Sequence, residues 1–124
     1  MNTLLTNDQV IERLIQWGCD VPGALPRFIG DRDFYCRMLA MLAGEEDFQK
    51  LGDALNAGDV KSSFDAAHTL KGVLGNIGLT PMYEEACSIV ELLRAGRLEG
   101  TREHYNTLMR QEKELEALLK EREA

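Results

Sequence analysis

Aromatic residues and prolines are scarce in this sequence. Aromatic side chains make up 6% of the 124 residues, and only three residues are proline. Aromatic residues favour β-strands and proline interrupts helices, so a shortage of both disfavours a β-rich fold and permits long helices. Leu, Ala, Glu, Lys and Arg, which are good helix formers, dominate instead. The composition therefore predicts an all-α domain.

Positive charge and long apolar runs are also lacking. Lys and Arg total 14 against 21 Asp and Glu, which gives a net charge of −7. Proteins that bind nucleic acids or anionic membranes need clustered cations, so both classes of partner are disfavoured. No run approaches the ~18 apolar residues that span a bilayer, and residues 1–5 lack the basic and apolar regions of a secretory signal. We expect a free-standing cytoplasmic protein.

Several kinds of chemical site have no support in the sequence. The three cysteines, Cys19, Cys36 and Cys87, are widely spaced, and we expect buried thiols in a reducing compartment. The sequence contains neither of the usual glycine-rich nucleotide-binding motifs, G-x-x-x-x-G-K-S/T and G-x-G-x-x-G. It also lacks the Glu-x-x-His pairs and the clustered His and Cys residues that bind metals in helical bundles. We therefore expect no cofactor and no metal. His104 follows Glu103 near the start of a helix and is predicted to be a solvated surface residue.

Capping residues and glycines divide the chain into helices. Thr6 to Gln9 match a capping box, Asp31 and Asp59 are predicted N-caps, and Thr80 is a predicted cap with Pro81 at the first helical position. The predicted helices lie at about residues 7–18, 31–44, 45–58, 59–78, 80–96 and 100–120, with a short helical piece near residues 28–29. Short connections favour antiparallel neighbours. We predict one domain over residues 1–124, with an extra N-terminal helix at 7–18. Its core, about 23–120, would be an antiparallel up-and-down four-helix bundle.

The predicted helix at 59–78 carries an unusual histidine in its stretch 63–78. At 100° per residue its apolar side chains form one stripe wide enough to face a core. The stripe consists of Ala66, Leu70, Val73, Leu74 and Ile77. His68 points almost directly away from this stripe. The residues on its face are Lys61, Phe64, Asp65, Lys71, Gly72 and Gly75.

The neighbours of His68 favour a reactive imidazole over an incidental surface side chain. Gly72 and Gly75 each destabilise the helix by about 1 kcal/mol relative to Ala, so we expect them to have another role. We interpret the two glycines as a strip of helix surface without side chains, which leaves the imidazole ring accessible. Lys71 can place its ammonium over that opening, and Phe64 is a candidate contact for a partner. Neutral imidazole has a nucleophilic ring nitrogen. These features together suggest a covalent phosphohistidine at His68.

The same stretch resembles the signature of histidine-containing phosphotransfer (HPt) domains. The resemblance is carried first by AHTLKG at residues 67–72 and by Ile77-Gly78. It continues through FIGD at 28–31, FY at 34–35, LNAGD at 55–59 and ACSIVE at 86–91, with Arg94. It covers roughly residues 23–120.

This resemblance implies a four-helix domain that carries phosphoryl groups between receiver domains in two-component signalling. His68 matches the phosphoacceptor, Lys71 the basic residue that stabilises the phosphoryl group, and Gly72 the small residue that keeps access open. Arg94, on the neighbouring helix, is a further candidate for that stabilisation. The family often has a polar residue there that faces the histidine, and Val90 or Glu91 falls at this place. The implied partners are receiver domains, which supply Mg²⁺, and a hybrid sensor histidine kinase.

Two other functions remain open from the sequence. The chain could be a helical adaptor that binds a receiver or kinase through the same face without phosphorylation. It could also be a phosphatase or inhibitor of a receiver. In each case we expect a monomer, since one bundle uses all the apolar stripes, and a chain with no kinase active site of its own.

Overall fold

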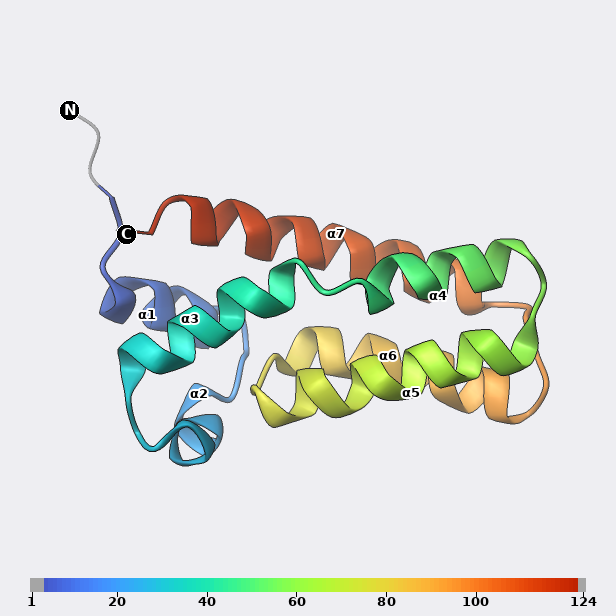
Figure 1. Cartoon of the computed structure of the whole chain (residues 1–124), viewed down its shortest axis with the longest axis horizontal. Coiled ribbons are helices and arrows are strands. Elements are labelled where there is room, and N and C mark those ends of the chain that lie inside the picture. The colour runs from blue at the N-terminus through green and yellow to red at the C-terminus, as the bar shows by residue number, and fades with distance from the viewer. Residues whose placement is uncertain (1–3, 123–124) are drawn as a thin grey trace.

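The computed structural model describes residues 4–122, and nearly all of them are in helices (Figure 1). The elements are α1 (Asn7–Gln16), α2 (Val21–Ala24), the 3₁₀-helix η1 (Leu25–Phe28), α3 (Arg32–Ala43), α4 (Asp47–Asn56), α5 (Val60–Asn76), α6 (Thr80–Arg94) and α7 (Thr101–Lys120). Within residues 4–122 the only β-type pairing is an isolated bridge. The predicted all-α class is confirmed, and no helix in this range is long and apolar enough to cross a bilayer.

Three of the predicted helix caps are present. The Thr6 hydroxyl accepts a hydrogen bond from the Gln9 amide, and the Gln9 side chain accepts one from the Thr6 amide, which completes the capping box. The carboxylates of Asp31 and Asp59 each accept a hydrogen bond, at 3.0 Å, from the amide three residues later. These side chains satisfy amides that have no partner inside the helix, and so they fix where α1, α3 and α5 begin.

The predicted cap of α6 is wrong by one residue. Thr80 is already helical, and the N-cap is Leu79, which makes no side-chain capping bond. The Thr80 hydroxyl donates to the Gly78 carbonyl at 3.4 Å instead. Leu79 is completely buried, so its side chain anchors the turn in the core and α6 starts directly after it. Burial thus overrides the preference for a polar cap at this turn.

Four of the helices lie side by side along the longest axis of the molecule (Figure 1). In this view α4, α5, α6 and α7 follow one another in alternating directions, and α3 continues the line of α4 beyond a short break. Helix α5 packs between α4 and α6, whereas α7 packs on α6 and also touches α3 and α4. Helix α5 therefore has neighbours on both flanks and is held firmly in the fold.

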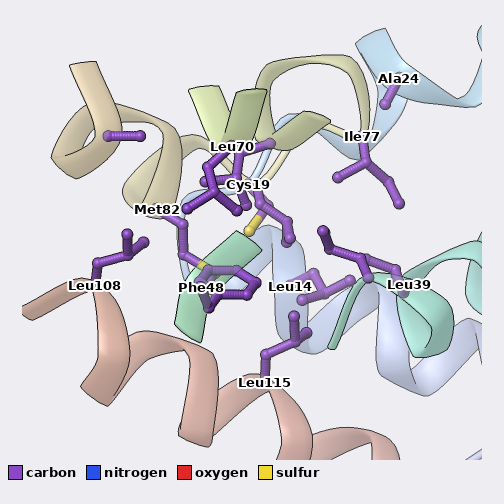
Figure 2. Packing of buried hydrophobic residues seen from close by; sticks show 14 of the residues in the cluster. Leu14, Cys19, Ala24, Leu39, Phe48, Leu70, Ile77, Met82, Leu108 and Leu115 are labelled. Carbon is purple, nitrogen blue, oxygen red and sulfur yellow. The ribbon is translucent and has the colours of Figure 1, made fainter. Parts of the chain in front are cut away.

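Every helix contributes to one hydrophobic cluster (Figure 2). The labelled side chains that meet there are Leu14, Cys19, Ala24, Leu39, Phe48, Leu70, Ile77, Met82, Leu108 and Leu115. The hydroxyl of the fully buried Tyr35 donates to the Ile77 carbonyl at 2.6 Å, which pairs two polar groups inside the core. Burial of apolar side chains from α1 to α7 in one cluster joins the N-terminal helices to the α5–α6 pair.

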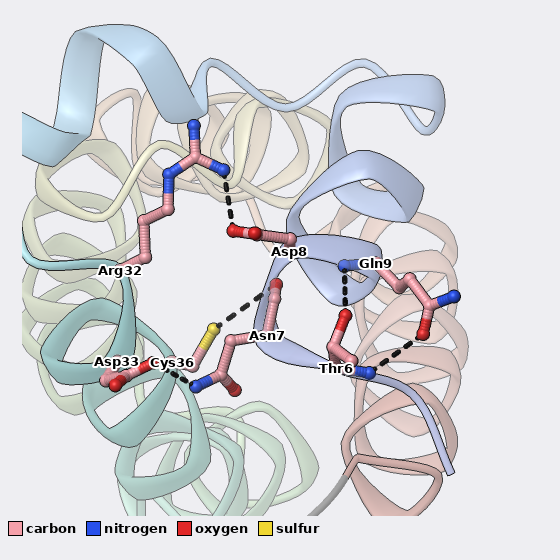
Figure 3. A network of polar contacts seen from close by, with 7 residues as sticks. All are labelled: Thr6, Asn7, Asp8, Gln9, Arg32, Asp33 and Cys36. Carbon is pink, nitrogen blue, oxygen red and sulfur yellow. Dashed lines mark hydrogen bonds and ion pairs between the residues drawn. The ribbon is translucent and has the colours of Figure 1, made fainter. Parts of the chain in front are cut away.

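Polar contacts also join α1 to α3 (Figure 3). An Arg32 nitrogen lies 2.7 Å from an Asp8 oxygen, and the Asn7 side-chain amide donates to Asp33 at 2.5 Å. The thiol of Cys36 is 3.9 Å from the Asn7 carbonyl oxygen. The Arg32–Asp8 pair is exposed and is worth at most about 1 kcal/mol, so burial of the apolar side of α1 holds this helix in place.

The two ends of the described chain meet. The Leu5 amide donates to the Glu121 carbonyl at 2.6 Å, and Leu5 and Arg122 form the isolated bridge. The Arg122 guanidinium donates to the Asn7 side chain at 3.2 Å. The segment before α1 is therefore fastened to the end of α7.

The cysteines differ from one another in burial. Cys19 and Cys36 are buried as predicted, and burial raises the pKa of the Cys19 thiol to about 12 and that of the Cys36 thiol to about 11. Both therefore stay protonated and unreactive at neutral pH. The prediction is wrong for Cys87, which is only half-buried. All three thiols are free.

Candidate functional site

His68 lies in the middle of α5 with its imidazole exposed to solvent. Two nearby residues of the same helix, Ala67 and Leu70, are completely buried. Helix α5 therefore presents His68 outward from a face that is fixed by packing against α4 and α6. An exposed ring on a rigid helix can be reached by another protein without any local rearrangement.

The His68 ring is stacked on Phe64, one helical turn earlier. Their ring centroids are 5.6 Å apart and the ring planes differ by only 15°. The Arg94 guanidinium, from the end of α6, lies over the Phe64 ring at 5.3 Å from its centroid. Arg94 also pairs with Glu91 at 3.4 Å. The structure therefore brings Phe64, His68 and Arg94 into one group that spans two helices.

Lys71 lies almost one turn beyond His68 and is half-buried. Within residues 4–122 its ammonium forms no ion pair, whereas Lys61 on the same helix is engaged by Asp65 at 2.9 Å. A cation without a counter-ion can meet an incoming anion at lower cost, because no existing pair must be broken. Lys71 therefore keeps an uncompensated positive charge within residues 4–122, three residues after His68 on α5.

Open space surrounds Gly72. A Cβ atom built on Gly72 meets no atom within 4 Å, apart from its own helix backbone and chain neighbours. The residue is exposed, and it follows His68 by one turn on the same side of α5. The surface beside the imidazole is therefore bare at this point, whereas the role of Gly72 in access is still a prediction.

The expectation of open space at Gly75 is wrong. A Cβ atom there would lie 2.9 Å from the ring of Tyr83, which is closer than real contacts allow. Tyr83 comes from α6 and covers this part of α5, so Gly75 permits close packing of two helices and does not clear a path to His68. The angle around α5 gives the direction of Gly75 but not the position of a side chain on another helix, and so the sequence did not indicate Tyr83.

Two further residues of the α5–α6 pair differ from expectation. Val73 was predicted to face the core, but it is 36% exposed, because it lies at the edge of the apolar stripe. Val90 is completely buried in α6, while Glu91 is exposed and engaged by Arg94. Neither side chain therefore supplies a free polar group toward the imidazole.

A groove with acidic walls runs beside α5 on the side of α4. Its volume is about 540 Å³, and its charged lining residues are Asp47, Lys50, Asp53, Asp59 and Asp65. Four carboxylates and one ammonium make this side repel anions. Within residues 4–122 no group of three His, Cys, Asp or Glu side chains is arranged to hold a metal ion. Lys71 of α5 and Arg94 of α6, the cations of the His68 region, are not among the lining residues of this groove.

The second histidine lies outside this site. His104, in the first turn of α7, was predicted to be solvated, but its Nδ1 atom is 2.7 Å from a Glu85 carboxylate oxygen of α6. Both side chains are partly covered, so the pair ties α6 to α7. Glu85 and His104 are 19 residues apart in the sequence, so local sequence patterns do not predict this contact.

Comparison with known proteins identifies the family. A family model described as the Hpt domain matches residues 40–123, which is more than half of the chain and includes α4 to α7 with His68, Lys71 and Gly72. No curated protein and no solved structure matches the chain. The matched span contains the helical frame and the exposed histidine described above. The chain belongs to the Hpt domain family.

Proposed function

We propose that His68 accepts a phosphoryl group from an aspartyl phosphate of a receiver domain and passes it to an aspartate of another receiver. Membership of the Hpt family gives the chain a general phosphotransfer role in two-component signalling, and Hpt domains are phosphocarrier modules and not kinases. One observation supports His68 as the residue that accepts the phosphoryl group. Its imidazole is exposed in the middle of α5, next to the open surface at Gly72.

The chemistry needs only a nucleophile from this chain. A ring nitrogen of neutral His68 attacks the phosphorus, the bond from phosphorus to the aspartyl oxygen breaks, and the carboxylate leaves. The second ring nitrogen keeps its proton, and transfer to the next receiver reverses these bond changes. Positioning and charge stabilisation account for most catalysis of phosphoryl transfer. We expect the receiver to supply Mg²⁺ and most of that stabilisation.

The surroundings of His68 support this assignment. The Lys71 ammonium, which forms no ion pair within residues 4–122, can meet the charge of the transferred group, and the bare surface at Gly72 leaves room for the receiver to approach. The same face provides a docking surface that includes Lys71, beside the stacked rings of Phe64 and His68. Gly75 contributes little to it, because Tyr83 covers that position.

Hpt domains interact with receiver domains and kinases of two-component systems. For this chain we propose that the phosphoryl donor is the receiver domain of a hybrid sensor histidine kinase. We also propose that the chain acts as a monomer, because its apolar helix faces are used in one core. Gel filtration with light scattering tests this, and a stable dimer would contradict it.

A phosphotransfer assay tests the function directly. The protein is incubated with receiver domains that carry ³²P-labelled aspartyl phosphate, alongside His68→Gln and His104→Gln variants. We expect label that is labile in acid and stable in alkali on the wild type and on His104→Gln, and none on His68→Gln. Label that persists on His68→Gln, or is absent from the wild type across a panel of receivers, would refute the proposal.

The other two functions give different results in the same assay. An adaptor binds the receiver equally well with His68→Gln, and no label ever reaches the chain. A receiver phosphatase causes loss of aspartyl phosphate while the chain stays unlabelled. Free phosphate, receiver-bound label and chain-bound label, measured together, therefore separate the three functions.

A further inference from the structure

We propose that Phe64 is a positioning residue that sets the plane of the His68 imidazole, and that Arg94 acts through Phe64 and not on the phosphoryl group. This proposal rests on the proposed function of His68. It assigns to Phe64 and Arg94 roles that differ from those indicated by the sequence, which were partner contact and phosphoryl stabilisation.

The stack between the two rings is nearly parallel. A centroid distance of 5.6 Å with an angle of 15° describes an offset stack, which is a favoured geometry for aromatic pairs. The residues are four apart on α5, so their side chains meet on one face without distortion of the helix. Such pairs contribute about 0.5–1.5 kcal/mol, which is sufficient to favour one orientation of an otherwise free surface histidine.

The plane of the imidazole matters for an in-line reaction. The nitrogen lone pair lies in the ring plane, so the phosphorus must approach along that plane. Reacting atoms held in a near-attack arrangement react much faster than freely rotating ones. Phe64 covers one face of the ring and fixes the plane, while the bare surface at Gly72 remains open for the approach.

Arg94 holds Phe64 from the neighbouring helix. The guanidinium carbon lies 5.3 Å from the Phe64 centroid, within the range of a cation–π interaction. Glu91, one turn earlier on α6, forms an ion pair with the same guanidinium at 3.4 Å and helps to orient it. Through these contacts α6 restrains the Phe64 ring, and Phe64 in turn restrains His68.

The test compares variants that keep or remove the Phe64 ring. Phe64→Tyr preserves a stacking surface, whereas Phe64→Leu preserves only apolar volume, and thermal unfolding verifies that each variant is folded. NMR of the two histidines, assigned with the His68→Gln variant, reports ring-current shifts. We expect upfield-shifted His68 ring protons in the wild type and in Phe64→Tyr, and loss of that shift in Phe64→Leu. Unshifted protons in the wild type would overturn the proposal.

Kinetics separate positioning from docking. At saturating phosphorylated receiver we expect transfer to slow about tenfold in Phe64→Leu and to recover in Phe64→Tyr. The receiver concentration that gives half-maximal rate should stay within about twofold of the wild-type value. A raised half-saturating concentration with an unchanged maximal rate would show that Phe64 is a docking residue, which overturns the proposal.

A double-variant cycle tests the role of Arg94. If Arg94 acts through Phe64, Arg94→Gln slows transfer in the wild type and has no further effect in Phe64→Leu. Equal slowing in both backgrounds would show direct action on the phosphoryl group and overturn this part.

If the wild type never takes label on His68, the proposed function and the positioning role both fail, while the NMR shift still reports whether the stack exists. The two failures are therefore distinguishable.

Discussion

Gly72 and Gly75 lie three residues apart on the same helix, yet their surroundings are opposite. Gly72 faces open space, whereas Gly75 lies under the Tyr83 ring. The first leaves a surface bare beside His68, and the second lets α6 approach α5 closely. The same residue type therefore lies in open space at one position and permits close packing at the other, and only the neighbouring helix distinguishes them.

The largest expected effect is on phosphotransfer at the open position. Gly72→Leu places a branched side chain beside His68, and we expect the transfer rate to fall roughly 100-fold, because the reacting atoms can no longer approach in line. Gly72→Ala is the matched control, and it should keep most of the rate. Transfer by Gly72→Leu within about twofold of the wild-type rate would show that this surface is not the path of approach.

The stability of matched leucine variants sharpens the comparison. Both variants gain about 1 kcal/mol of helix propensity, but Gly75→Leu must also displace Tyr83, a cost of about 2 kcal/mol. We expect the two free energies of unfolding, measured by urea denaturation, to differ by about 2 kcal/mol. Adding Tyr83→Ala to each variant should relieve the strain only at position 75. Equal stability of the two leucine variants would contradict the close contact.

Burial also affects an ionisable residue on α7. Glu112 is 5% exposed, and burial together with the neighbouring Glu116 raises the pKa of its carboxyl to about 7. The folded state therefore holds this proton more tightly than the unfolded state. The stabilisation that comes from the protonated Glu112 carboxyl is fully present below about pH 4.5 and is lost as the pH rises through about 7.

A matched pair of variants tests this titration. Glu112→Gln should raise the free energy of unfolding at pH 8 by about 2 kcal/mol and should have little effect at pH 4. Glu114→Gln, at an exposed position two residues away, should change stability little at either pH. Urea denaturation across this pH range measures both variants, and equal effects of the two would contradict the role of burial.

The smallest effect is expected on the buried side of α5. Ser63 is completely buried, and its hydroxyl has no hydrogen-bond partner within residues 4–122. Ser63→Ala removes the cost of an unpaired hydroxyl, so we expect a gain of about 1 kcal/mol in the free energy of unfolding. Ser62→Ala is a useful contrast, because that hydroxyl donates to Asp59 at 2.7 Å, and its removal should not stabilise the protein.

Local features were the most predictable from the sequence. The all-α class follows from composition, and the caps at Thr6, Asp31 and Asp59 follow from side chains that bond to amides only three residues away. The outward direction of His68 follows from helical periodicity alone. Each of these properties depends on a few neighbouring residues, so a single sequence contains enough information to predict them.

Contacts between helices were not predictable in the same way. Tyr83 over Gly75, Arg94 over Phe64, and Glu85 beside His104 each join residues of two helices. Such contacts depend on how far one helix is shifted along another, and periodicity gives no information on that shift. The sequence therefore indicated which residues face outward near His68, but not which of them are covered.

The bridge between Leu5 and Arg122 brings the two ends of the described chain to one place on the molecule. The segment before α1 and the end of α7 therefore support each other. Unfolding of either one would leave the Leu5 amide or the Glu121 carbonyl without its backbone partner.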